Sequence, residues 1–173
     1  MGNIIHLIYN KEDKDFVRFF RSEVQVKNKN AIFNCYPSPD KFESKISEKI
    51  KQKKANQMKS ADIVVCLIGH NTYLNKWIDW EIETAAKFGK PLVGVKVHGS
   101  WDDTVPESME EHGGNIVSVN YDDMYDAVKN AFMQVTTYQY ASGGRQARYP
   151  KSSGTNYRED LKPDIPSGKI RNR

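Results

Sequence analysis

The sequence predicts an α/β domain in which five parallel strands form a doubly wound sheet with helices on both faces. Two observations lead to this prediction. Short apolar runs alternate along the chain with segments whose apolar residues recur at helical spacing. Such alternation builds βαβ units, and their right-handed crossovers place helices on both faces of a parallel sheet. The run 62–68 (DIVVCLI) is also apolar almost throughout, as expected for a central strand buried on both faces.

The elements follow from these patterns in order. We expect strands at 3–9, 31–36, 62–68, 92–97 and 115–119, and helices at 13–26, 42–58, 75–88 and 121–135. Gly89 and Pro91 should end the third helix. The second helix is lysine-rich opposite an apolar face, and we expect those lysines to lie in solvent. Residues 98–114 are polar and contain a proline, so no regular helix is expected there.

Charge divides the chain into two parts. Residues 139–173 hold eight basic and three acidic residues, a net charge of +5 in a chain whose net charge is +4, which leaves −1 on residues 1–138. We therefore expect one domain at 1–138 and a basic, polar, flexible extension at 139–173. Such an extension could contact nucleic acid or membranes, but a solvated extension is the simpler interpretation, and no nucleic-acid or membrane partner is predicted.

Several classes of protein are excluded by missing patterns. The sequence has neither a GxGxxG after the first strand, nor a GxxxxGK[ST] motif, nor a GxSxG elbow, which argues against dinucleotide-binding dehydrogenases, P-loop NTPases and α/β-hydrolases. No His or Cys spacing suggests a metal site. Cys35 and Cys66 are expected to be reduced, buried thiols. With neither a signal-peptide pattern nor an apolar run of ~18 residues, a cytoplasmic protein is expected.

The segment 69–97 (GHNTYLNKWIDWEIETAAKFGKPLVGVKV) carries the most chemical information. Trp77 and Glu81 are four positions apart in the expected third helix, beside its apolar stripe and near the carboxyl end of the third strand, where ligands bind in such sheets. A carboxylate there is partly desolvated, yet favoured by the helix N-terminus. The spacing alone equally allows a surface glutamate that helps to satisfy that terminus. Glu83 should face outward.

The same segment carries a family resemblance. IIHLIYNKEDKDFVRFF, ISEKIKQKK and KSADIVVCLIGHNTYLNKWIDWEIETAAKFGKPLVGV resemble, in this order, the TIR-like family of Thoeris anti-phage defence proteins. The resemblance covers roughly residues 3–135. It implies a flavodoxin-like TIR fold and cleavage of NAD at the nicotinamide–ribose bond by the glutamate of a Trp-x-x-x-Glu arrangement, here Trp77 and Glu81. It also implies a cyclic ADP-ribose-type signal that activates a separate, ThsA-like effector protein.

The resemblance suggests further site residues. Tyr9 and Asn10 end the first strand, where TIR enzymes contact their substrate, and Tyr36 begins the loop that covers the NAD pocket and mediates self-association. Asn71, Tyr73 and Trp77 should lie near the candidate catalytic residue Glu81; each aromatic could equally serve packing. NAD is a substrate in this interpretation, and no cofactor is expected.

Two alternatives remain open. One is a non-catalytic TIR-like interaction module, which would assemble normally in a Glu81→Gln variant and turn over no substrate. The other is a different N-glycosidic enzyme on a related fold, such as a nucleoside deoxyribosyltransferase, which would exchange bases on nucleosides and ignore NAD.

Overall fold

The computed structural model describes residues 3–36, 42, 45–98 and 104–141. Five strands and seven helical segments alternate along this part of the chain. The strands are β1 (Asn3–Ile8), β2 (Ala31–Cys35), β3 (Ile63–Ile68), β4 (Leu92–Lys96) and β5 (Asn115–Ser118). The helices are η1 (Lys11–Asp13), α1 (Lys14–Lys27), α2 (Lys45–Ser60), η2 (Thr72–Leu74), α3 (Lys76–Lys87), α4 (Glu107–Glu111) and α5 (Tyr121–Ala141).

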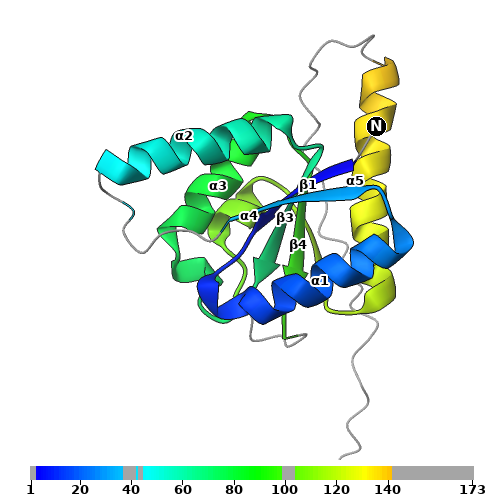
Figure 1. Ribbon diagram of the computed structural model, residues 1–173, viewed down its shortest axis with the longest axis horizontal. Coiled ribbons are helices and arrows are strands. Elements are labelled where there is room, and N and C mark those ends of the chain that lie inside the picture. The colour runs from blue at the N-terminus through cyan, green and yellow to red at the C-terminus, as the bar shows by residue number, and fades with distance from the viewer. Residues whose placement is uncertain (1–2, 37–41, 43–44, 99–103, 142–173) are drawn as a thin grey trace, which may run out of the picture.

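The strands form one parallel sheet in the order β2-β1-β3-β4-β5 (Figure 1). The chain moves outward from β1 to β2, then crosses back over β1 to β3 and continues in the other direction. This reversal places the topological switch point between β1 and β3. The predicted doubly wound, flavodoxin-like sheet of five parallel strands is confirmed.

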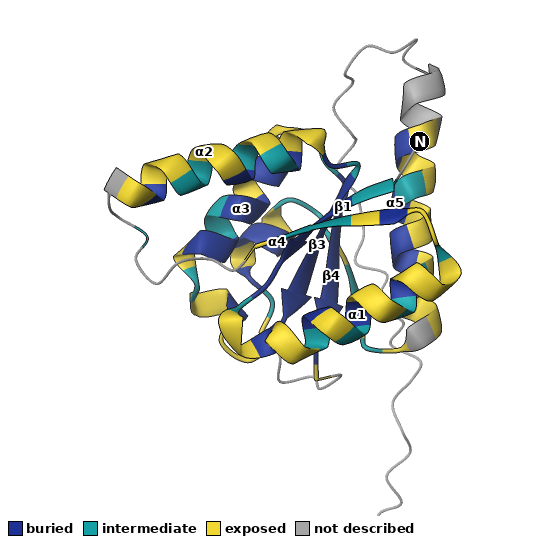
Figure 2. Ribbon diagram, in the orientation of Figure 1, coloured by how far each residue is buried: buried dark blue, intermediate teal, exposed yellow. Residues whose placement is uncertain are grey.

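Helices cover both faces of the sheet, and strand residues alternate between two apolar cores. One core joins odd-numbered residues of β1 and β3, such as Leu7 and Val65, to α1 and α5. The other joins even-numbered residues, such as Ile8 and Cys66, to α2, α3 and α4. In Figure 2 the central strands are buried along their length, while the outer sides of α1 and α2 are exposed. By the same alternation, His6 of β1 faces the core of α2 and α3.

Most element boundaries differ from the expected ones by one to three residues. Gly89, at φ 65°, follows the end of α3 as predicted, because its left-handed conformation suits glycine. The expectation of no helix in 98–114 is wrong for α4, a single short helix in which Met109 is fully buried and Ser108 donates to Asp79 of α3. Tertiary burial stabilises this segment, whose polar sequence gave no periodic signal.

The C-terminal helix is longer than expected. α5 runs to Ala141, and the predicted extension at 139–173 lies outside the described residues from residue 142 onward. In the part of the chain that the structure describes, no helix is both long and apolar enough to cross a bilayer.

Candidate active site

Glu81 of α3 forms a buried ion pair with Lys54 of α2, and His6 of β1 lies against the same carboxylate. Lys54 Nζ is 2.6 Å from Glu81 Oε1, and His6 Nε2 is 3.2 Å from Glu81 Oε2. The side chains of Glu81 and His6 are 1% exposed and that of Lys54 is 3% exposed. These three residues, from three different elements, are called the Glu81 cluster below.

The local sequence of α3 turns Glu81 inward. Asn75 caps the helix, because its Oδ1 accepts the backbone N–H of Trp77 at 3.0 Å. Ile78 and Ile82 are fully buried against the sheet. Glu81 follows Ile78 by three positions and directly precedes Ile82, so it lies at the flank of this apolar stripe. Since α2 packs against α3, that flank is covered by protein, and Glu81 is fully buried where the sequence predicted only partial desolvation.

Lys54 and His6 were not among the predicted site residues. The expectation that the lysines of the second helix lie in solvent is wrong for Lys54, which is buried. Its position carried a signal, because it lies four residues after Ile50 and four before Met58, in the apolar stripe of α2. His6 carried a similar signal, a polar residue within an otherwise apolar strand, on the same face as Ile8. A buried polar residue at a core position indicates a polar partner.

Opposing effects act on the pKa of the Glu81 carboxyl group. Burial raises this pKa, because the carboxylate loses its hydration. The hydrogen bond from His6 and the positive charge of Lys54 lower it and outweigh burial, so the pKa lies below its ordinary value of 4.5. Glu81 is therefore ionised at neutral pH. Because a carboxylate only accepts hydrogen bonds, the proton in the hydrogen bond between His6 and Glu81 is carried by His6 Nε2. Within the described residues, the other ring nitrogen of His6, Nδ1, has no hydrogen-bond partner.

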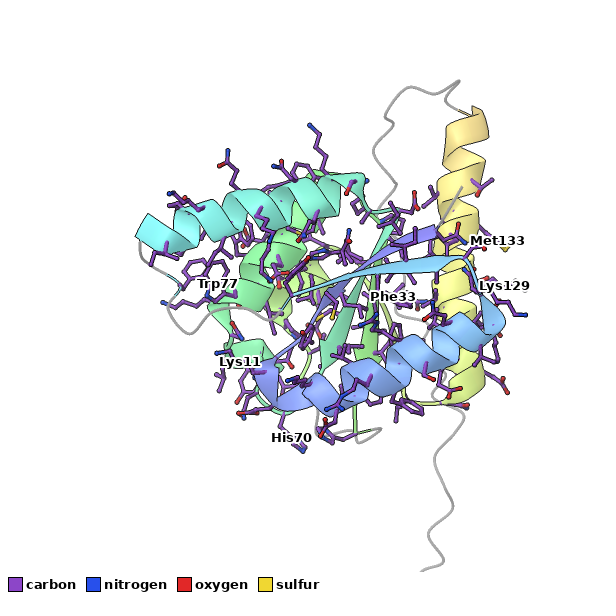
Figure 3. The ribbon with its side chains drawn as sticks, in the orientation of Figure 1. Lys11, Phe33, His70, Trp77, Lys129 and Met133 are labelled. Atoms are coloured by element: carbon purple, nitrogen blue, oxygen red, sulfur yellow. The ribbon has the colours of Figure 1, made fainter. Side chains whose placement is uncertain are left out.

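Aromatic rings pack beside the Glu81 cluster. Trp77, one helical turn before Glu81, makes edge-to-face contacts with Phe42 at 5.0 Å and with Trp80 at 6.1 Å between ring centroids. The ammonium of Lys51 lies 4.1 Å from the Phe42 centroid and 6.0 Å from that of Trp77. Figure 3 labels Trp77 on the side of the sheet that carries α2 and α3. Its ring is 2% exposed, so in this state it packs in the interior and cannot stack on a ligand.

Two of the predicted tyrosines have different surroundings. The backbone oxygen of Tyr36 accepts a hydrogen bond from Lys54 Nζ at 3.0 Å, which ties the end of β2 to the Glu81 cluster, while the Tyr36 side chain is exposed. Tyr9 instead packs in the core under α1 and α5, on the other face of the sheet from Ile8. Its hydroxyl accepts from Cys35 Sγ at 3.6 Å, and burial raises the Tyr9 pKa above its usual value.

The remaining predicted residues lie at the carboxyl edge of β1 and β3. Asn10 caps η1 with its side-chain oxygen, which is 3.5 Å from the amide nitrogen of Asn75. Asn71 donates to Glu12 at 2.9 Å, and Tyr73 is exposed in η2. These side chains therefore form a polar edge beside the N-terminus of α3.

The chemistry that the Glu81 cluster allows is charge stabilisation. An ionised carboxylate in a low-dielectric interior strongly stabilises a neighbouring positive charge, and in this state that charge belongs to Lys54. Elsewhere in the described ranges, no three His, Cys, Asp or Glu side chains are grouped so that they could hold a metal ion.

Comparisons with known proteins assign the family. The family model described as "Thoeris protein ThsB, TIR-like domain" matches residues 6–102, more than half of the chain, and this range includes the whole Glu81 cluster. Among the solved structures, 25 chains match. One is a 2-deoxyribosyltransferase from the psychrotolerant bacterium Bacillus psychrosaccharolyticus, 19% identical, with a TM-score of 0.51 over 71% of this chain and 90% of that one.

At 19% identity, the likeness to the deoxyribosyltransferase concerns the fold alone. No curated protein matches the chain significantly. The family model and the order of the strands agree with the predicted TIR-like fold. The chain belongs to the TIR-like domain family of the Thoeris protein ThsB.

Proposed function

We propose that this protein cleaves the nicotinamide–ribose bond of NAD, with Glu81 as its catalytic carboxylate. The observation that carries the proposal is the place of Glu81: buried against Lys54 and His6, one turn after Trp77 on the helix that follows β3. Membership of the ThsB family supports the same assignment.

The reaction needs one carboxylate and no acid. As the bond between C1′ of the ribose and the pyridinium nitrogen breaks, its electron pair goes to that nitrogen, and nicotinamide leaves as a neutral molecule. Positive charge develops on the ribose as an oxocarbenium ion, which the negative charge of Glu81 would stabilise. Ordinary glycosidases require a second carboxyl group to protonate an alkoxide leaving group, and this leaving group does not need one.

The group that attacks C1′ next decides the product. Water would give ADP-ribose and release a proton. A ring nitrogen or hydroxyl of the same molecule would give a cyclic product, which requires a folded substrate and exclusion of water. We propose a cyclic ADP-ribose-type signal, made in the cytoplasm by a protein that self-associates and passed to a ThsA-like effector in anti-phage defence.

One structural observation favours a second candidate function. Glu81 is fully buried in its ion pair, which is also what a purely structural contact in a non-catalytic interaction module would look like. A nucleoside deoxyribosyltransferase activity gains no separate support, since that likeness extends to the fold only.

The test is a comparison of metabolites in bacteria that express the protein, with and without phage. NAD, nicotinamide and ADP-ribose isomers are measured by mass spectrometry for the wild type, Glu81→Gln and the matched control Glu83→Gln. Glu83 is on the same helix but exposed, beside Lys87. We expect an ADP-ribose isomer from the wild type and Glu83→Gln, reduced at least about 100-fold in folded Glu81→Gln. Equal product from both variants would refute the role of Glu81, and no product from any across several phages would favour the interaction module.

A further inference from the structure

The Glu81 cluster is closed to any substrate in the described state. Glu81 is fully buried, and a positive charge already lies against it, since Lys54 Nζ is 2.6 Å from Oε1. An oxocarbenium carbon stabilised by this carboxylate would need to approach one of its two oxygens. Lys54 lies against Oε1 and His6 against Oε2, so a substrate carbon reaches neither oxygen in this state.

A second lysine of α2, Lys51, is paired with Glu48 at 3.1 Å and lies among aromatic rings. Its ammonium is 4.1 Å from the centroid of the Phe42 ring and 6.0 Å from that of Trp77, one turn before Lys54. Aromatic faces at such distances attract cations, and the pyridinium of NAD is a cation. The surroundings of Lys51 are therefore suited to a positive charge.

The helix that carries these lysines is weakly anchored by apolar contacts. Among the α2 side chains that the structure describes, the buried ones are Ser47, Lys54 and Met58, and Met58 alone is apolar. By comparison, α1 buries three apolar side chains and α3 buries four. Elements with few buried apolar contacts open at the lowest free energy. Met58 lies near the end of α2, and Ile50, in the turns before it, is only half-buried.

A buried ion pair is suited to reversible closure. Its Coulomb attraction is largely offset by the dehydration of both charges, so separating Lys54 from Glu81 into water exposes two groups that hydrate well. Lys54 Nζ also donates to the backbone oxygen of Tyr36 at 3.0 Å, so a single side chain ties α2 to both α3 and the end of β2.

We propose that Lys54 is an autoinhibitory latch, which holds α2 closed over Glu81 and must leave before substrate can reach that carboxylate. The inference rests on the proposed role of Glu81. The described structure is then the latent state, and activation is the displacement of α2.

The test combines amide hydrogen exchange with nicotinamide release from NAD by purified protein, at pH 7.5. Lys54→Met is compared with the wild type and with Lys49→Met, the same substitution at an exposed position of the same helix. We expect exchange of the amides of residues 45–53 to rise at least about 10-fold in Lys54→Met and not in Lys49→Met, because the buried negative charge of Glu81 is then no longer offset by an ammonium, and its hydration favours the open position of α2. Nicotinamide release should rise by a similar factor without any trigger.

The two readouts separate the latch from the NAD reaction. Faster exchange without nicotinamide release would support the latch and count against the proposed chemistry. Unchanged exchange in folded Lys54→Met would overturn the latch, whatever the activity. The latch would also be overturned if Lys54→Met failed to make the product that the wild type makes in phage-infected cells, because Lys54 would then be required for the reaction.

A second variant covers the case in which Lys54→Met does not fold. Lys54→Met/Glu81→Leu removes both charges together, so the hydrated open state loses its advantage. The latch predicts that any rise in exchange in this variant is confined to the amides of α2. Exchange at least about 10-fold faster in α1 and α5 as well would mean that the ion pair stabilises the whole fold, and the latch would be refuted.

Discussion

The energetics of the Glu81 cluster give a quantitative prediction, in which Lys54 and Glu81 are substituted singly and together. Because both side chains are almost fully buried and 2.6 Å apart, removal of one leaves an uncompensated charge in the interior. Lys54→Met and Glu81→Leu should each lower the free energy of unfolding by about 3–5 kcal/mol. In either single variant, α2 can open and let water hydrate the remaining charge. The loss of stability then cannot exceed the free energy that this opening requires.

The double variant should behave differently, because it leaves no buried charge. Lys54→Met/Glu81→Leu should lie within about 2 kcal/mol of the wild type, the remaining loss coming from the hydrogen bonds of His6 to Glu81 and of Lys54 to the Tyr36 backbone oxygen. The exposed pair of Lys87 and Glu83, 3.5 Å apart, provides the comparison. Lys87→Met should change stability by less than about 1 kcal/mol.

Urea unfolding at pH 7.5, analysed by linear extrapolation, measures all these variants. For a domain of this size, a loss of 3–5 kcal/mol lowers Tm by roughly 10–20 °C, so the single variants remain measurable at room temperature. The reasoning would be refuted if the two single losses added up in the double variant, since additivity means that the charges do not interact in the folded protein.

Three further predictions concern other features of the fold and its pH dependence. The stability of the wild type relative to Glu81→Gln should be constant above about pH 4.5 and fall at lower pH. The folded pKa of Glu81 is lowered, so the stability that its ionised form contributes is lost as the pH drops through that folded pKa. Urea midpoints measured between pH 3 and 7 test the sign. Gly69→Ala should lower the free energy of unfolding by about 1–3 kcal/mol, because a Cβ there would lie 2.7 Å from Asp13 Cγ. In Gly114→Ala the added Cβ would meet the flexible side chain of Met109, so the loss of stability should be smaller. The same urea series measures both variants. Trp77→Phe should lower the free energy of unfolding by less than about 1.5 kcal/mol, because it keeps a packed ring and removes an indole N–H that has no partner in the described residues. Trp77→Ala should lower it by about 3–5 kcal/mol, because it removes a buried ring. Thermal melts distinguish the two variants.

The fold could be predicted from the sequence because its strands and helices have clear and different periodicities. Residues 63–68 are apolar without interruption, and the helix after them has an apolar stripe that starts at the Asn75 cap. The same reasoning missed α4, because a five-residue helix is too short to show a period. Its single fully buried side chain, Met109, depends on contacts with distant parts of the chain.

The candidate site was predicted less completely, for a physical reason. Glu81 was proposed from its spacing to Trp77 and its place after β3 together with the family resemblance, because the spacing alone also allowed a surface glutamate. Its partners could not, because no local rule joins a lysine at position 54 and a histidine at position 6 to a glutamate at 81. Both interrupt apolar patterns, however, and a polar residue at a core position predicts a buried partner. That rule indicates that a partner exists without naming it.

Tyr9 illustrates the opposite difficulty. It follows β1 at the carboxyl edge, where ligands bind in such sheets, yet its ring packs toward α1 and α5. Because successive residues of a strand point to opposite faces, a shift of one position decides whether a side chain at a strand end faces the α2 side or the α1 side. The odd-numbered positions of β1 face α1, so counting from His6 would have placed Tyr9 away from Glu81.

An ion pair has an advantage over an apolar contact for closing such a site. An apolar latch would expose hydrophobic surface on opening, and a neutral polar latch would leave the buried carboxyl free to protonate. Lys54 and His6 keep the pKa of Glu81 below its ordinary value in the closed state, so the carboxylate is already ionised when α2 moves away. No proton then has to leave between opening and bond cleavage, and the rate of activation should not depend on pH between about 6 and 8 through Glu81.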